Sequence, residues 1–337
     1  MLQMGKVCVK VEEKGREKMK KAIVFCMAIL LVFGLAACGT SEESIVVVPS
    51  SSSIPPIPTS KPDLSPVFTY SPYAITAFSK EAMGESYALY CDLVDALLNY
   101  DCEVSGFESE TQFHGLWCTL RQEFPPAEKL LADYGDTDEP YSFSDGRVTL
   151  KYLLDKTAHL QLLDNYAKRI QKDLSILEEG DTEVIQIAKL HDLVGTTIVY
   201  GETTRVVYDA IMSNQGVCED YAEYLIVLLN QIGVECYYAC SDGKGVVSHA
   251  WVIAKMEGQF FHFDPTWHWH FEKWNWFAMG DKQRKVSLLD AGVEDPSGDR
   301  VNIIGHMNWL SLERIPLPEC PSSYKPESRN NLEPWNW

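Results

Sequence analysis

The sequence predicts an α+β protein in which a helix packs on an antiparallel sheet behind a mainly helical N-terminal segment. Apolar residues recur at helical spacing along residues 73–100, 108–123, 157–178 and 182–194. Another helical pattern begins at Cys218, and three strand-like segments separated by turns follow it. Helices followed by a run of hairpin-linked strands are typical of this fold class.

Residues 1–37 have the features of a secretory signal. Lys20 and Lys21 precede an apolar stretch from Ala22 to Leu35. A short positive region and an apolar core before small residues define such a signal, and this core is shorter than the ~20 residues of a membrane span. A start at Met19 would give a compact signal peptide. An uncleaved anchor is the alternative, and it also places the protein outside the cytoplasm.

The signal ends in Leu35-Ala36-Ala37-Cys38, which resembles a bacterial lipobox. In signals of that kind the cysteine is lipidated and becomes the new N-terminus. The resemblance implies lipidation of Cys38, attachment to the membrane through that lipid, and a place in the cell envelope. Residues 38–68 are rich in Ser and Pro, which predicts an extended tether.

Composition excludes several classes of protein. The 48 acidic residues outnumber the 29 basic ones, for a net charge of −19. Nucleic-acid binding requires clustered Lys and Arg, so we expect no nucleic-acid partner. A single long apolar run excludes a multi-span membrane protein. The sequence does not indicate an oligomeric state.

Residues 69–181 predict a mainly helical scaffold. The second of its helical patterns stops before Pro125-Pro126. Tyr141–Leu154 contains the turn signal Ser144-Asp145-Gly146 between two strand-like segments, which predicts a hairpin. No chemistry-bearing motif occurs in this part of the chain.

Cys218 lies in the first turn of the next predicted helix. Gly216 provides a turn before this helix, and Gly233 is predicted to end it. Free N–H groups and the positive end of the helix dipole favour a thiolate at this position. Glu219 and Asp220 oppose it, so the thiol requires a positively charged partner.

The strand-like segments after this helix are Val234–Cys240, Ser248–Met256 and Gln259–Asp264. A tight hairpin centred on Glu257-Gly258 places Trp251 opposite Asp264 and His249 opposite Thr266. Asp264 is then a diagonal neighbour of His249 on the same face, within reach of a hydrogen bond.

A cysteine at a helix start, a histidine and an aspartate are the groups that thiol acyl chemistry requires. The thiolate attacks a carbonyl, the histidine moves the proton, and the carboxylate orients the imidazole. A backbone N–H at the helix start can stabilise the oxyanion.

Residues 185–279 resemble the transglutaminase-like superfamily, whose core is a papain-like α+β fold. The resemblance rests on Gly216-Val217-Cys218-Glu219-Asp220-Tyr221-Ala222, His249-Ala250-Trp251-Val252 and Phe263-Asp264-Pro265-Thr266-Trp267, in that order. It implies that Cys218 is the nucleophile, His249 the base and Asp264 the orienting acid. We expect this domain to span residues 182–312, with an irregular tail at 313–337.

The sequence also offers candidates for substrate contacts. Met212 occupies the position where papain has a glutamine, so Gln215 and Tyr200 are the candidates for a second oxyanion donor. Trp267 and Trp269 belong to a dense aromatic segment that could pack the core or wall a cleft. The substrate-binding residues that we predict are Gln215, Tyr221, Trp251, Trp267 and Trp269.

We expect no metal and no cofactor. Cys236 and Cys240 share a strand face near His262, His268 and His270, but no C-x-x-C pair occurs and the histidine spacing is irregular. There is also no phosphate-binding glycine-rich loop. Seven cysteines remain after the signal and the lipid site, and an odd number leaves at least one of them outside any internal disulfide.

The favoured hypothesis is an extracytoplasmic thiol enzyme acting on protein or peptide amides, including cell-wall peptide. Water as acceptor gives a peptidase or amidase, and an amine gives an acyltransferase. Hydrolysis is favoured because no bulky amine-binding module is visible. The alternative is a non-catalytic peptide- or glycan-binding lipoprotein that keeps the core fold.

Overall fold

The computed structural model describes residues 67–133, 136–137, 139–201, 206–241, 249–268, 276–284, 303–305 and 307–324. All of them belong to one compact unit of the chain, Pro66–Trp337. The predicted signal, lipid site and tether lie outside the described residues, apart from 67–68. Among the described helices, none is both long and apolar enough to cross a membrane.

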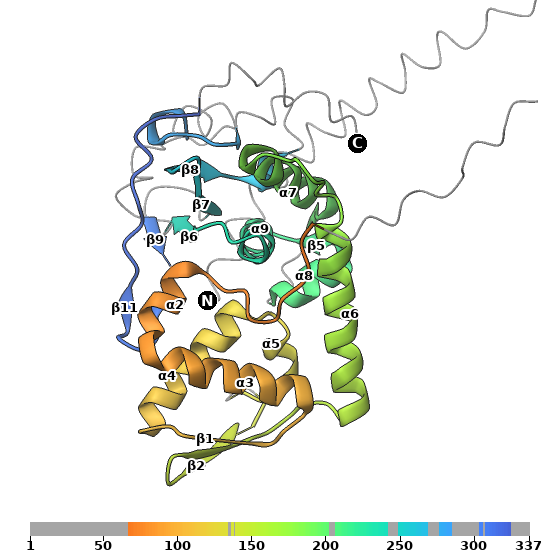
Figure 1. The fold of residues 1–337 in the computed structure, drawn as a ribbon, viewed down its shortest axis with the longest axis vertical. Helices are drawn as coiled ribbons and strands as arrows, with labels where there is room; N and C mark the ends of the chain where they lie inside the picture. The colour runs from red at the N-terminus through yellow and green to blue at the C-terminus, as the bar shows by residue number, and fades with distance from the viewer. Residues whose placement is uncertain are drawn as a thin grey trace, which may run out of the picture. The chain divides into compact units, whose positions relative to one another are not determined.

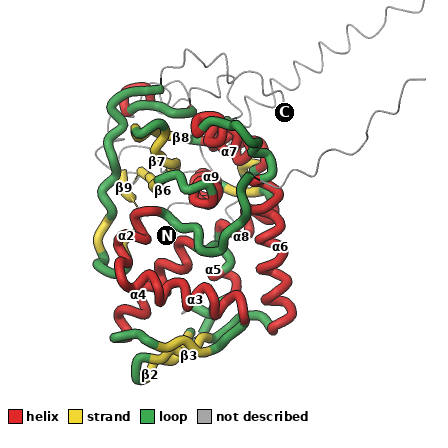
Figure 2. The backbone as a smooth tube through the Cα atoms, viewed as in Figure 1, coloured by secondary structure: helices red, strands yellow, loops and turns green. Residues whose placement is uncertain are grey.

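The first half of this unit is mainly helical, as predicted (Figures 1 and 2). Its helices are α2 (Ala77–Met83), η1 (Gly84–Ser86), α3 (Tyr87–Asn99), α4 (Glu110–Glu123) and α5 (Ala127–Leu130). The predicted 73–100 helix is broken at Gly84, which has a φ of 51°. Only glycine adopts such backbone angles without strain, so the chain turns there.

A small antiparallel sheet covers one end of these helices. The predicted hairpin forms β2 (Tyr141–Ser144) and β3 (Arg147–Leu150), and Asp145 and Gly146 in its turn both have positive φ. Such a turn matches the twist of the two strands. β1 (Glu103–Ser105) pairs with the other edge of β3, which the sequence did not indicate.

The second half packs helices on a four-stranded antiparallel sheet of order β8-β7-β6-β9. Its helices are α6 (Lys156–Leu174), α7 (Glu183–Thr197), α8 (Val207–Ser213) and α9 (Cys218–Gln231). The strands are β6 (Cys236–Ser241), β7 (Ala250–Met256), β8 (Gln259–Phe263) and β9 (Ile303–Gly305). α9 contacts β6 and β7 on one side and α7 on another, which confirms a helix packed on an antiparallel sheet.

The register of the β7–β8 hairpin agrees with the sequence. Met256 pairs with Gln259 and Val252 with Phe263, so the turn is Glu257-Gly258. Both turn residues have positive φ, as a two-residue hairpin requires. Trp251 and Asp264 are the next residues beyond the Val252–Phe263 pair, on the side away from the turn.

α6 belongs to the packing of the second half, although the sequence grouped it with the scaffold. Tyr166, Ile170 and Leu174 are buried in the same apolar cluster as α7, α9 and β7. Gln171 also accepts a hydrogen bond of 2.9 Å from the backbone N–H of Tyr70.

A chain that starts at Thr182 therefore exposes the cluster that α6 covers. We expect it to unfold at lower denaturant concentration than a chain starting at Phe68, or to be insoluble, because several large apolar side chains lose their contacts at about 1.5–3 kcal/mol each. Urea unfolding followed by tryptophan fluorescence measures this. Equal midpoints for the two chains would contradict the role given to α6.

The C-terminal segment packs on both halves. Met307–Asn308 forms β10 and pairs with β11 (Glu313–Arg314), so the predicted irregular tail begins with a short strand. Trp309 donates a hydrogen bond of 3.1 Å to Gln122 on α4. Farther along, Cys320 is buried and the backbone N–H of Tyr324 bonds Ala278. Irregular backbone thus covers part of the sheet.

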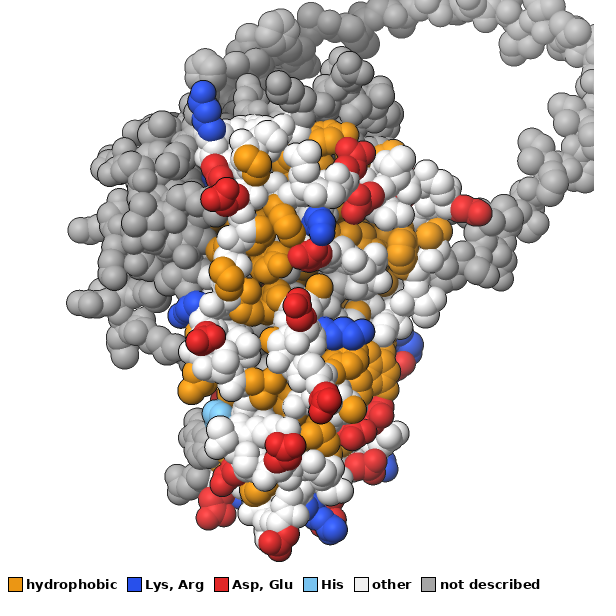
Figure 3. Space-filling view, turned by 60° about the vertical axis from the view of Figure 1, so that its left-hand side comes forward, with side chains coloured by type: hydrophobic (Ala, Val, Ile, Leu, Met, Phe, Trp, Pro, Cys, Tyr) orange, Lys and Arg blue, Asp and Glu red, His pale blue; other side chains and the backbone are white. Residues whose placement is uncertain are grey.

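Charged side chains are interspersed rather than segregated on the face drawn in Figure 3, with hydrophobic side chains between them. Several basic residues are paired with acids; Arg121, for example, lies 2.6 Å from Glu128 and 2.9 Å from Asp133.

Candidate active site

Cys218 is the first residue of α9, as the sequence predicted. The chain reaches it through β5 (Gln215–Gly216), which pairs with β4 (Val199–Tyr200). The carboxylate of Asp220 folds back and accepts a 2.7 Å hydrogen bond from the backbone N–H of Val217, which caps the helix. A Cβ on residue 216 would lie 2.6 Å from the Cβ of Asp220, so only glycine allows this approach.

His249 and Asp264 meet at the end of the β7–β8 hairpin. The Nε2–H of His249 donates to Oδ2 of Asp264 over 2.7 Å. Asp264 is fully buried at the junction of β8 and η2 (Pro265–Trp267), where its own backbone N–H bonds Trp276. The Cys218 thiol is also close enough to His249 to help raise the pKa of the imidazole. Because Asp264 occupies Nε2, Nδ1 is the nitrogen that remains available to the sulfur.

The surroundings of His249 and Asp264 favour the charged form of both groups. Burial by itself lowers the pKa of His249, but the Asp264 carboxylate and the Cys218 thiol outweigh burial and raise that pKa to about 10. Burial by itself raises the pKa of Asp264, whereas His249 and Arg284 hold that pKa below its ordinary value. At neutral pH His249 is therefore an imidazolium paired with the Asp264 carboxylate.

Trp267 lies beside this group. Its ring centroid is 5.8 Å from that of His249, and it stacks on Trp276 at 5.2 Å. Trp276 is buried, whereas Trp267 is half-buried. The aromatic segment thus packs the core through Trp276 and offers Trp267 next to the histidine. Trp269 and Cys38 lie outside the described residues.

Two predicted substrate contacts do not fit their positions. Trp251 is fully buried, and Tyr221 is 2% exposed with its hydroxyl donating to the carbonyl of Ile198 over 2.5 Å. Neither presents a surface to a bound peptide. The prediction that they contact the substrate is therefore wrong, and both instead pack inside the domain around the site. Gln215 is exposed on β5, and the exposed ring of Tyr200 lies 6.3 Å from that of Tyr221.

The sequence analysis did not predict that Arg284 belongs to the site. It lies in a helical turn at residues 281–284 and is 1% exposed, and its Nη1–H donates to Oδ2 of Asp264 over 3.2 Å. A single arginine far from the three motifs carries no pattern that would identify it.

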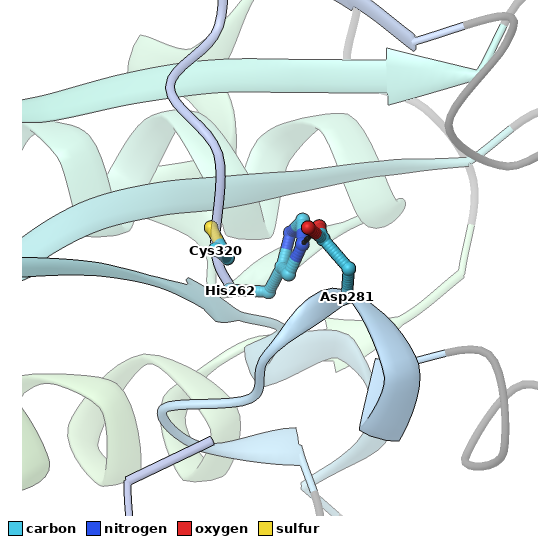
Figure 4. A group of neighbouring side chains, drawn as sticks. All are labelled: His262, Asp281 and Cys320. Carbon is cyan, nitrogen blue, oxygen red and sulfur yellow. Dashed lines mark hydrogen bonds and ion pairs between the residues drawn. The ribbon is translucent and has the colours of Figure 1, made fainter. Parts of the chain in front are cut away.

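One group of side chains has ligand atoms close enough for a metal among the described residues: His262, Asp281 and Cys320, within 4.8 Å of one another (Figure 4). The indole N–H of Trp251 donates to Nδ1 of His262 over 3.0 Å, so the ring proton lies on Nε2 and donates to Asp281 over 2.8 Å. A metal at Nε2 requires that proton to leave, so these hydrogen bonds fit a structural pair better than a metal ligand.

The alternative zinc residues are not gathered into one site in the described part of the chain. The thiol of Cys236 is buried and donates to Oδ1 of Asn230 over 3.5 Å. His268 lies 3.4 Å from Asp192 on α7. His270 lies outside the described residues.

Comparison with known proteins identifies the domain. The model of the transglutaminase-like superfamily matches residues 171–265, which contain Cys218, His249 and Asp264. Residues 171–265 are a transglutaminase-like superfamily domain. The match begins inside α6, where the packing of the second half also begins. No curated protein sequence matches the chain.

Two solved structures are similar in part. A candidate cysteine protease from Cytophaga hutchinsonii is 18% identical with a TM-score of 0.25, covering 36% of this chain and 50% of its own. A TGase is 12% identical with a TM-score of 0.28, covering 39% of this chain and 44% of its own. The chain thus spans half or less of these two proteins, and the assignment rests on the family match.

Proposed function

We propose that this transglutaminase-like protein is a thiol enzyme that acts on protein or peptide amides through Cys218, His249 and Asp264. The observation that carries the proposal is the position of His249, which hydrogen-bonds the Asp264 carboxylate over 2.7 Å and is close enough to interact with the Cys218 thiol. A histidine held between a thiol and a carboxylate is the arrangement that acyl transfer through a thioester uses.

The residues divide the reaction as follows. The Cys218 thiolate attacks the amide carbon, and the oxyanion forms near the N–H groups at the start of α9. His249 gives its proton to the leaving amine, and the carbon–nitrogen bond breaks to leave a thioester. A water or an amine then loses its proton to His249 and attacks the thioester, which releases Cys218. Asp264 holds the imidazole in place throughout.

We propose hydrolysis as the outcome, with transfer of the acyl group to an amine as the alternative. The half-buried face of Trp267 beside His249 provides an apolar wall for the substrate. Binding of a peptide without turnover is the outcome that would replace this proposal.

Selective alkylation tests the proposal. Cys218 in the native protein is expected to react with iodoacetamide at pH 6 at least about 100-fold faster than Cys118, because its thiolate is stabilised by an imidazolium. Mass spectrometry of each cysteine measures the rates. His249→Ala is expected to remove the advantage.

Cys118 is a control within the same chain. Its sulfur lies 3.8 Å from Nδ1 of His114, so it also has a histidine neighbour. Burial raises the pKa of Cys118 to about 11, so proximity of an imidazole alone does not activate a thiol there. A Cys218 that reacts no faster than Cys118 and is insensitive to His249→Ala would favour the binding protein instead.

We also propose that the protein acts outside the cytoplasm, anchored by a lipid at Cys38. Cys38→Ser is expected to abolish incorporation of a radiolabelled fatty acid and to block maturation, because the lipidated thiol is gone. Equal labelling of the variant and the wild type would exclude the lipoprotein.

A further inference from the structure

A buried cation lies against the acid of the proposed triad. The guanidinium of Arg284 is 1% exposed and donates to the same oxygen of Asp264 that accepts from His249. Within the described part of the chain, no hydrogen-bond partner lies at Oδ1 of Asp264. The described hydrogen bonds to this carboxylate thus come from His249 and Arg284, both at Oδ2.

Arg284 is held in place by Trp251. The guanidinium carbon lies 3.6 Å from the centre of the indole ring, a close stacked contact for an arginine. The ring of His249 lies roughly parallel to the same indole, with centroids 6.0 Å apart and planes at 19°. Trp251 therefore contacts both partners of Asp264.

A second histidine–aspartate pair fixes this indole and the turn that carries Arg284. The indole N–H donates to His262, and His262 donates to Asp281. Asp281 lies in the same helical turn as Arg284, and its backbone N–H bonds the carbonyl of Cys320 over 2.8 Å. Figure 4 shows the imidazole of His262 against the carboxylate of Asp281.

We propose that Arg284 is a positioning residue, which keeps the Asp264 carboxylate ionised and directed at His249. Trp251, His262 and Asp281 hold Arg284 in that place. This inference rests on the proposed function, because it concerns the acid that orients the histidine. It assigns a role to a side chain outside the matched residues 171–265.

The charges around Asp264 define the pH effect. His249 faces it from the start of β7 and Arg284 from the 281–284 turn, and Cys218 on α9 faces His249. On α7, Asp192 lies near His268, and His191 packs edge-on against Phe277. Among the described residues, loss of the guanidinium leaves His249 as the cation beside Asp264, so the carboxylate takes up a proton at higher pH.

The test measures the alkylation rate of Cys218 against pH in the full chain, with Arg284→Met, Arg284→Lys and Arg121→Met. Below the pKa of Asp264 the imidazolium loses its partner, and the alkylation rate of Cys218 falls. This fall at low pH is the acidic limb of the profile. Arg284→Met is expected to move this acidic limb up by about one pH unit, which is roughly a tenfold slower reaction on the limb. Arg284→Lys is expected to move it only partway, because an ammonium keeps the charge but not the planar stack.

Arg121→Met is the matched control. Arg121 is a largely buried arginine paired with Glu128 and Asp133, so its loss lowers stability without moving the acidic limb. A folded Arg284→Met with the wild-type profile, or identical profiles for Arg284→Met and Arg284→Lys, would overturn the proposal. If Arg284→Met does not fold, Arg284→Lys decides, and an unmoved limb then overturns it.

The wild-type profile separates the two proposals. A wild-type Cys218 with no dependence on His249 contradicts the proposed function. A fast, His249-dependent Cys218 whose acidic limb ignores residue 284 contradicts only the role of Arg284.

Discussion

Cys218→Ala is expected to abolish turnover of a peptide amide, whether the acyl group passes to water or to an amine. Every step of the proposed reaction runs through the sulfur, so the rate falls by at least about 10⁴-fold. The measurements are ammonia or peptide release and incorporation of a labelled primary amine. Their ratio in the wild type also shows which acceptor the enzyme uses.

The fold is expected to survive this change. Cys218 is half-buried at a helix end, and alanine retains its Cβ. The far-ultraviolet circular dichroism and the melting temperature should stay close to those of the wild type.

Cys240→Ala is the matched control, because Cys240 is a half-buried thiol on β6 that is close enough to interact with Cys218 electrostatically. Burial is the main reason that the pKa of Cys240 lies above its ordinary value. Turnover that survives Cys218→Ala and disappears in Cys240→Ala would show that Cys240, and not Cys218, is the nucleophile.

Asp264→Asn is expected to lower turnover by about 10²- to 10⁴-fold while Cys218 remains in place. An asparagine cannot supply the negative charge that stabilises the imidazolium, and its amide can donate to Nε2 and select the wrong tautomer. Steady-state kinetics at pH 7 measure the loss. Wild-type kinetics with asparagine would show that His249 works without an orienting acid.

The same change should also reduce stability, because it leaves the buried guanidinium of Arg284 without its ion pair, at a cost of about 3–5 kcal/mol. The double variant Asp264→Asn with Arg284→Met removes both charges. It is expected to recover part of the stability in chemical unfolding without recovering turnover, which separates the catalytic loss from the folding loss.

The direction of the pH dependence follows from the two pKa shifts. The pKa of Asp264 is lowered, so its contribution to stability is present above its ordinary value near 3.9 and is lost as pH falls through the folded value. The pKa of His249 is raised to about 10, so its contribution is complete below its ordinary value near 6.5 and is lost as pH rises through 10. The pair therefore stabilises the wild type across the neutral range, and Asp264→Asn should flatten that dependence.

Local sequence determined the parts of the site that depend on short-range geometry. The position of Cys218 at a helix start follows from the turn at Gly216 and the apolar spacing after it. The pairing of β7 with β8 follows from a two-residue turn, because a turn of that length leaves one register. Those two local rules, with the order of the motifs, were sufficient to place His249 near Asp264.

Only the tertiary structure decided the contacts between segments that lie far apart in the chain. Arg284 reaches Asp264 from a turn 20 residues later, and the indole of Trp251 is covered by that arginine instead of facing a substrate. β9 joins the sheet from residues 303–305, and α6 packs into the second core. Periodicity and turn chemistry act over a few residues, whereas these contacts are selected by the burial of charge and apolar surface in the assembled fold.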